Sequence, residues 1–261
     1  MAHRVFGWAP VEINASWGLN SIRQGMAYSI CNTLECPECR LLFLDIRFDD
    51  SEMAALYSGY RGEEYTSLRE HYEPGYRARN ATLASGVNYI PQVEKFLGQW
   101  LPERPRVLDW GGDSGKNTPF RAQASVLDIY DISAQPVVEG ARSVTREDAA
   151  NNSYDLIVSS HVLEHVPYPR NHLLEIKEMM KEGTVLYVET PLEELVRLNP
   201  ERSSLASLKR HWHEHINFYS EKSLSKMAQS CGFEVLEVAC LPVSGHGLSW
   251  SVLQMACRIK I

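Results

Sequence analysis

The stretch Pro105-Arg-Val-Leu-Asp-Trp-Gly-Gly-Asp-Ser-Gly115 joins a short apolar strand directly to a glycine-rich turn. Val107 and Leu108 supply the strand, and Asp109 ends it. Three glycines allow backbone shapes or a close ligand approach that side chains would forbid: Gly111, Gly112 and Gly115. A strand, such a turn and a helix form the first crossover of a doubly wound α/β sheet, whose ligands bind at the carboxyl ends of the strands. The turn is therefore the expected position of a nucleotide-like cofactor.

The residues around the turn distinguish between two kinds of cofactor-binding motif. A dinucleotide-binding loop has the pattern G-x-G-x-x-G, and from Gly111 this chain has Asp113 and Lys116 where the second and third glycines belong. Written as D-x-G-x-G-x-G, the stretch resembles motif I of class I S-adenosylmethionine-dependent methyltransferases. Asp109, Gly111 and Gly115 match that motif, and Asp113 replaces its middle glycine. A carboxylate at this position could repel the carboxylate of the cofactor or contact its ammonium group.

The composition describes a globular chain. Its 261 residues are 44% hydrophobic, which is enough for one large domain or one domain with a small appendage. A formal net charge of -7 argues against nucleic-acid and anionic-membrane partners, which usually require a basic face. No stretch approaches the ~18 apolar residues of a membrane span, so we expect a cytoplasmic protein. The six cysteines are too few and too unevenly spaced for a disulfide framework, which leaves reduced thiols or metal ligands.

An acidic residue follows the expected second strand. That strand, 125–130, ends at Asp131, which lies 22 residues after Asp109 (131 − 109). The spacing fits an acid that accepts hydrogen bonds from both ribose hydroxyls of a nucleotide, with Ile132 beside it in the cofactor site. Asp128 is the competing acid, but its position in the middle of the strand is less suited to a ligand that binds beyond strand ends.

Another acid follows the expected third strand. The strand covers 142–145, and Asp148 and Ala149 come after it. By resemblance to the methyltransferase pattern, Asp148 bonds the adenine amino group and Ala149 lies in the same site. The alternative is that Asp148 caps a helix, which is a common use of aspartate.

The longest resemblance runs through residues 154–167 and 185–191. An apolar strand, the segment LEHV, a helix stopped by a glycine and a second apolar strand follow one another as in class I methyltransferases. The order implies that Ser159 and Ser160 lie at the sheet edge near the reactive methyl group. We expect a structural role for His165, because a single imidazole commonly anchors local backbone.

The N-terminal part contains a possible metal site. Cys36-Pro-Glu-Cys39 is a C-x2-C knuckle, a spacing that lets two thiolates approach one tetrahedral metal, with Cys31 as a third ligand. Zinc would suit this set, and the alternative is a loop of reduced cysteines without metal. With the tyrosine-rich stretch that follows, the knuckle resembles the N-terminal zinc-binding segment of bacterial methyltransferases, many of which act on sugars or similar metabolites. We therefore divide the chain into an N-terminal cap, 1–85, and a methyltransferase domain, 86–261.

Three histidines are candidates for a general base. His213 and His215 occupy alternate positions, which face the same side of an extended segment. Similar segments in these methyltransferases face the substrate cavity, whereas metal binding or packing at a lid hinge are the alternatives. His161 follows the fourth strand on the cofactor side and is the reserve candidate. An alcohol acceptor needs a base, and a neutral imidazole has a suitable pKa.

Together these features predict a Rossmann-like α/β fold: a seven-stranded doubly wound sheet with an N-terminal cap and a C-terminal antiparallel edge hairpin. The resemblance implies that the chain transfers a methyl group from S-adenosylmethionine to a small polar metabolite, through O-methylation of a sugar or carbohydrate-precursor hydroxyl. One alternative is a non-catalytic protein that binds S-adenosylmethionine or zinc. The other is an NAD-linked oxidoreductase, which the missing glycines of the dinucleotide pattern disfavour.

Overall fold

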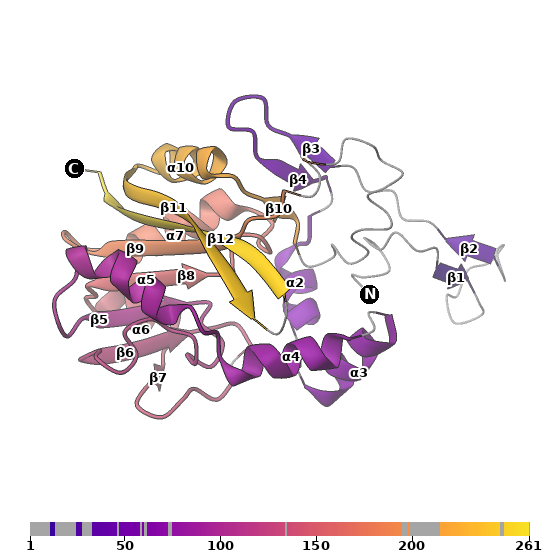
Figure 1. Ribbon diagram of the computed structural model, residues 1–261, viewed down its shortest axis with the longest axis horizontal. Coiled ribbons are helices and arrows are strands. Elements are labelled where there is room, and N and C mark those ends of the chain that lie inside the picture. The colour runs from indigo at the N-terminus through magenta and orange to yellow at the C-terminus, as the bar shows by residue number, and fades with distance from the viewer. Residues whose placement is uncertain are drawn as a thin grey trace.

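The computed structural model describes residues 11–13, 25–27, 33–45, 47–57, 59, 62–72, 75–133, 135–194, 198, 215–245 and 248–260. Its central feature is a seven-stranded sheet in the order β11-β12-β9-β8-β5-β6-β7 (Figure 1). The strands are β5 (Arg106–Trp110), β6 (Val126–Tyr130), β7 (Arg142–Ser143), β8 (Leu156–Ser160), β9 (Val185–Pro191), β11 (Phe233–Gly245) and β12 (Leu248–Ile259). β5 to β9 pair in parallel, whereas β12 pairs antiparallel with both β9 and β11. The predicted doubly wound sheet with an antiparallel edge hairpin is thus confirmed.

Helices lead into the sheet and connect its strands. They are α2 (Asp50–Tyr57), α3 (Glu63–Tyr72), α4 (Tyr76–Ser85), α5 (Ile90–Leu97), α6 (Arg146–Asn151), α7 (Pro169–Met179) and α10 (Glu221–Ser230), with a 3-10 turn η2 (Gly98–Trp100) after α5. Within the described residues, no helix has the length and apolar character needed to cross a membrane.

Two layers of buried side chains cover the two faces of the sheet. Leu108 and Ile157 belong to one layer, with the apolar sides of α7 and α10, whereas Val107 and Leu156 belong to the other, with α5. Successive side chains of a strand point to opposite faces, so neighbours in the sequence enter different layers. The near-continuous apolar strands 107–108 and 156–158 are explained by burial on both faces.

The strand directions bring several separate segments of the chain to one edge of the sheet. Parallel pairing places the ends of β5, β6, β8 and β9 together at the carboxyl edge. β12 runs the other way, and its register pairs Val252 with Pro191, so β12 begins where β9 ends. The glycine turn, the loop after β8, the end of β11 and the start of β12 therefore share this edge.

A smaller, three-stranded sheet ties the N-terminal part to the rest of the chain. Its order is β10-β4-β3, with β3 (Thr33–Glu35), β4 (Leu42–Leu44) and β10 (Asn217–Phe218). Antiparallel pairing sets Leu42 opposite Phe218, a residue far along the chain (Figure 1). A separate two-stranded ladder joins β1 (Val11–Ile13) to β2 (Gly25–Ala27). The proposed boundary after residue 85 coincides with the end of α4, but the β4–β10 pairing crosses it.

Candidate functional site

The glycine turn follows β5 and is tightly surrounded. Gly111 has a φ of +89°, a left-handed conformation that favours glycine, and its N–H donates to the carbonyl of Tyr130 at 2.7 Å. A Cβ at Gly112 would lie 2.5 Å from Cγ of Asp109, which no side chain can occupy without displacing that carboxyl group. These contacts explain why glycine is required at both positions.

Asp113 adopts the backbone conformation of the glycine that it replaces. Its φ is +52°, and aspartate is one of the few residues that enters this left-handed region readily. Its N–H donates to Oδ2 of Asp131 at 2.8 Å. The departure from motif I therefore preserves the shape of the turn and links it to the end of β6.

Asp131 lies at the carboxyl edge, whereas Asp128 is buried inside. Oδ1 of Asp131 accepts the N–H of Ser133 at 2.8 Å, and the neighbouring Ile132 side chain is 62% exposed. Asp128 is fully buried, and its carboxylate accepts hydrogen bonds from Arg142 and from the hydroxyl of Tyr154. These contacts give Asp128 a structural role and leave Asp131 as the acid at the ligand edge.

The side chain of Asp109 packs against the glycine turn. Its carboxyl group is buried and accepts a short hydrogen bond from the hydroxyl of Thr118. Burial, which disfavours the charged form, raises the pKa of Asp109 to about 7, although the Thr118 hydrogen bond opposes the shift. The residue therefore shapes the turn by packing and hydrogen bonding.

Asp148 and Ala149 lie in the first part of α6. Asp148 Oδ2 accepts the N–H and the hydroxyl of Thr145, and the Asp148 N–H donates back to the Thr145 hydroxyl, which completes a capping box. Ala149 is fully buried, and its N–H donates to the Thr145 carbonyl. The capping alternative is thus present in the structure, and the adenine contact of these residues stays a prediction.

The two serines at the end of β8 face different surroundings. Ser159 is buried, and its hydroxyl lies 3.2 Å from Nε2 of His172. Ser160 donates to Oε1 of Glu189 at 3.0 Å. Of the pair, Ser160 belongs to the polar cluster at the carboxyl edge.

Glu189, at the end of β9, is the centre of that cluster. It is buried, and its carboxylate accepts hydrogen bonds from Tyr89 at 2.8 Å and from Tyr187 at 2.6 Å. The hydrogen bonds and the positive charge of His161 lower the pKa of Glu189, although burial acts in the opposite direction. Tyr89 precedes α5 and was not expected in the site, because 100 residues separate it from its carboxylate partner.

His161 bridges two buried carboxylates. Its Nδ1 lies 3.1 Å from Oε1 of Glu164, and its Nε2 lies 3.0 Å from Oε1 of Glu189. Burial alone would lower the pKa of His161, but the hydrogen bonds to both carboxylates outweigh it and raise the pKa to about 10. The backbone of His161 is also left-handed, with a φ of +55°. Both ring nitrogens are therefore occupied as donors.

A second histidine cluster lies beside the first. Nδ1 of His215 is 2.7 Å from Oε2 of Glu193, and the rings of His215 and His165 meet edge to face with centroids 4.8 Å apart. His165 also lies within 3.8 Å of Glu164. The structure thus brings His161 and His215 to one region of the edge through Glu164, whereas His213 lies outside the described residues. Glu164 and Glu193 were not expected there, because only the folded chain brings them to these histidines.

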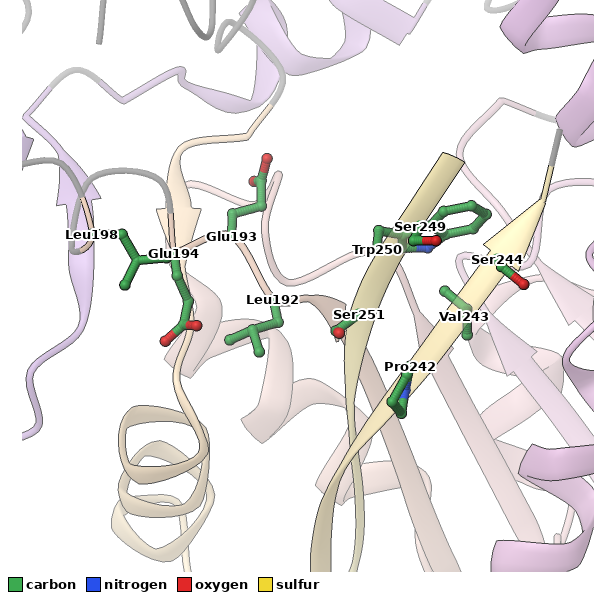
Figure 2. A pocket seen from close by; sticks show the side chains of 10 residues that line it. All are labelled: Leu192, Glu193, Glu194, Leu198, Pro242, Val243, Ser244, Ser249, Trp250 and Ser251. Atoms are coloured by element: carbon green, nitrogen blue, oxygen red, sulfur yellow. The ribbon is translucent and has the colours of Figure 1, made fainter. Parts of the chain in front are cut away.

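A pocket of about 670 Å³ opens next to Glu193. Figure 2 shows side chains from residues 192–194 and 198 on one side and from the β11–β12 hairpin, 242–244 and 249–251, on the other. The lining combines two carboxylates, three serines and the indole of Trp250, which is 40% exposed. This mixture suits a ligand with several hydroxyl groups and one apolar face.

The knuckle cysteines lie around the turn between β3 and β4. Cys36 accepts hydrogen bonds from the backbone of Cys39 and Glu38, which lower its pKa, whereas burial raises the pKa of Cys39. The N–H of Cys36 donates to the carbonyl of Leu41 at 2.9 Å. Stabilisation of the Cys36 thiolate fits a metal ligand. Cys31 lies outside the described residues.

Comparisons with known proteins agree with the architecture. A family model described as a methyltransferase domain matches residues 79–238, more than half of the chain. No curated protein matches the sequence. Among solved structures, the chain is similar to the 1,6-didemethyltoxoflavin-N1-methyltransferase of Burkholderia thailandensis, which holds 1,6-didemethyltoxoflavin and S-adenosylhomocysteine. The identity is 14%, 87% of this chain and 98% of that chain are covered, and the TM-score is 0.54.

Two further structures have similar shapes. The magnesium protoporphyrin IX methyltransferase of Synechocystis PCC 6803, with bound S-adenosylhomocysteine, has 14% identity, coverage of 80% and 100%, and a TM-score of 0.49. An S-adenosylmethionine-dependent methyltransferase of Clostridium acetobutylicum ATCC 824 has 12% identity, coverage of 76% and 100%, and the same TM-score, 0.49. Because these sequence identities are low, the similarity to these structures concerns the fold alone.

Proposed function

The chain belongs to the methyltransferase-domain family, and from this premise we propose that it methylates a hydroxyl oxygen of a sugar or sugar-like metabolite. It has the fold of an S-adenosylmethionine-dependent methyltransferase. When bound, S-adenosylmethionine supplies a methyl group on a positively charged sulfur. The family match favours methyl transfer over the NAD-linked alternative, which already lacks two glycines of its pattern.

Residues at the carboxyl edge suit this donor. Gly112 carries no side chain, since a Cβ there would lie 2.5 Å from Cγ of Asp109, so the turn has only backbone groups to offer a ligand at this position. Each carboxylate oxygen of Asp131 accepts one backbone N–H and keeps a second lone pair for a ribose hydroxyl. The exposed Ile132 offers the adenine an apolar contact. The main support for this cofactor site is the hydrogen bond from the Asp113 N–H to Asp131, because it joins the glycine turn to the acid that is proposed to bind the ribose hydroxyls.

The pocket beside Glu193 supports a hydroxylated acceptor. Carboxylates of Glu193 and Glu194 accept hydrogen bonds from hydroxyl groups, and the face of Trp250 can pack against the C–H side of a sugar ring. The pocket lies just beyond the end of β9 and against the last residues of β11 and the first of β12, on the same sheet edge as the glycine turn. Donor and acceptor can thus approach each other across this edge.

We propose that His215 is the general base that removes the hydroxyl proton of the acceptor. An ionised carboxylate only accepts hydrogen bonds, so in the 2.7 Å contact Glu193 accepts the Nδ1 proton of His215, and in the neutral form of this tautomer the lone pair is on Nε2. Nε2 of His215 would take the hydroxyl proton of the acceptor as its oxygen receives the methyl group that a bound S-adenosylmethionine would supply. His213 and His161 remain candidates, but both nitrogens of His161 already face carboxylates.

Two assignments of the N-terminal part also stay proposals. Residues 1–85 form the cap and residues 86–261 form the methyltransferase domain. Zinc is proposed at Cys36 and Cys39, with Cys31 as the third ligand. The support is the stabilised thiolate of Cys36 and its placement in a turn with Cys39.

Ligand binding and product formation test the proposal separately. S-adenosylmethionine and S-adenosylhomocysteine should raise the melting temperature of the purified chain, whereas NAD should not, because only native-state ligands stabilise a protein. Formation of S-adenosylhomocysteine is then measured with panels of sugars, amines and phenols. Turnover with a phenol or an amine but with no sugar would overturn the acceptor assignment. Tight cofactor binding without turnover on any acceptor would favour the non-catalytic alternative.

A further inference from the structure

Glu164, His165 and His215 form a compact group outside the cofactor site. One ligand atom from each lies within 4.8 Å of the other two, and within the described part of the chain this is the one such group. Glu164 and His165 come from the loop after β8, whereas His215 precedes β10. A carboxylate and two imidazoles are ligand types that suit a divalent transition metal.

Glu164 carries an unsatisfied oxygen. Its side chain is 1% exposed, and among the described residues Oε2 has no hydrogen-bond partner. A buried carboxylate oxygen without a donor is costly, because it has given up its water. Oε1 faces His161 and His165. A cation would supply Oε2 with the missing partner.

Backbone bonds hold the two segments of the group in place. The carbonyl of Glu164 accepts the N–H of Ile216 at 2.8 Å and that of Asn217 at 3.1 Å. The side-chain amide of Asn217 donates to the carbonyls of Leu163 and Val166 at 3.0 and 2.9 Å. The two backbone segments are therefore held close together before any metal binds, which lowers the entropic cost of binding.

Glu193 completes the arrangement from outside the group. Its contact with Nδ1 of His215 favours the imidazole tautomer in which Nε2 can coordinate a metal. Carboxylates commonly orient the histidine ligands of metals in this way. The three carboxylates Glu164, Glu189 and Glu193 carry three negative charges, and the protonated His161 between the first two carries one positive charge. The two remaining negative charges are those that a divalent cation would balance.

We propose that Glu164, His165 and His215 bind a divalent transition metal ion, with zinc as the best match. Tetrahedral zinc at ~2.1 Å from its ligands sets them ~3.4 Å apart, so modest side-chain rotation closes the present spacing. Three protein ligands leave a fourth position for water or an acceptor oxygen, as in catalytic zinc sites. The metal site itself does not depend on the proposed function, and only its consequence for catalysis rests on it. A bound cation takes the lone pair of His215, so the acceptor hydroxyl would lose its proton because the cation lowers its pKa and not because His215 acts as a base.

Cobalt binding followed by absorption tests the site in the full chain. A Cys36→Ser/Cys39→Ser variant removes the knuckle thiolates, so any remaining cobalt spectrum comes from nitrogen and oxygen ligands. We expect this variant to bind one equivalent of Co²⁺, displaced by Zn²⁺, without a thiolate charge-transfer band. Adding Glu164→Gln or His215→Asn should abolish binding, and Glu193→Gln should weaken it ~10-fold to 100-fold. His71→Asn, at an exposed position on α3, is the matched control.

The outcomes separate this site from the proposed function. Absence of cobalt binding in the double-cysteine variant, or binding that survives His215→Asn, overturns the site and leaves the group as a hydrogen-bonded ion cluster. S-adenosylhomocysteine affinity and melting temperature, measured on each variant, reveal misfolding. Because Glu164 is buried, the more exposed His215 provides the decisive variant if Glu164→Gln does not fold. Cobalt binding without turnover on any acceptor overturns the proposed function but not the metal site.

Discussion

Asp131→Ala is the substitution that tests the cofactor site most directly. In the structure, Asp131 accepts the N–H groups of Asp113 and Ser133, both at 2.8 Å. The variant therefore loses two internal hydrogen bonds and the expected acceptor of the ribose hydroxyls. A hydrogen bond to a charged group contributes ~1.5 to 3 kcal/mol, which corresponds to a roughly 10-fold to 150-fold weaker Kd for S-adenosylhomocysteine. The two orphaned N–H groups should also lower the free energy of unfolding by about 1 to 3 kcal/mol.

Calorimetric titration with S-adenosylhomocysteine and denaturant unfolding measure the two effects. Asp155→Ala is the matched control, because Oδ2 of Asp155 also accepts a backbone N–H, that of Arg106 at 2.8 Å. Asp155 precedes β8 and lies at the opposite edge of the sheet. Its loss should reduce stability and leave the Kd unchanged. A wild-type Kd for Asp131→Ala, or an equal loss of affinity in both variants, would refute the reasoning.

The remaining predictions concern the turn, the acceptor side and the knuckle. Gly112→Ala should destabilise the protein by ~1 to 3 kcal/mol and weaken cofactor binding, because its Cβ would lie 2.5 Å from Cγ of Asp109; unchanged unfolding would contradict this. Because burial raises the pKa of Asp109 to about 7, above its unfolded value of ~3.9, its contribution to stability declines as pH rises through this range, by up to about 4 kcal/mol. Asp109→Asn should therefore gain stability relative to wild type at about pH 8 compared with about pH 5, and a pH-independent difference would exclude this titration. Glu193→Gln should lower kcat with little effect on S-adenosylhomocysteine affinity, measured by turnover and titration. Freshly reduced wild-type protein should contain about one equivalent more zinc than the Cys36→Ser/Cys39→Ser variant, and equal zinc contents of the two proteins by elemental analysis would exclude the knuckle site.

Local patterns made the sheet and the cofactor edge predictable. The strand and turn at 105–115 are fixed by neighbouring residues: apolar side chains for a strand buried on both faces, then glycines where no Cβ fits. The acid at the end of β6 also follows from strand order, because Asp131 must leave the sheet at its carboxyl edge. The conformation of Asp113 was not predictable, because a side chain alone does not specify a left-handed φ.

Residues that meet only through tertiary folding escaped prediction. Tyr89 reaches Glu189 across 100 positions of sequence, and Glu193 reaches His215 across 22. No local period or motif encodes such distances. The pairing of β4 with β10 is similarly distant, and it places the N-terminal hairpin against the segment that carries His215. The β3–β4 hairpin is therefore joined to the segment before α10 by a β-ladder as well as by the chain.

The position of His161 limits what its replacement can reveal about catalysis. The imidazole lies between Glu164 and Glu189, so His161→Ala would leave two buried carboxylates without their shared donor. Such carboxylates either take up protons or draw in water, and both responses disturb the neighbouring clusters. A loss of turnover in this variant would thus follow from disorder as readily as from a missing base. His215 has its own carboxylate partner, Glu193, and replacing it leaves the bridge at His161 intact. Replacement of His215 consequently tests the acceptor side of the site without breaking the bridge between Glu164 and Glu189.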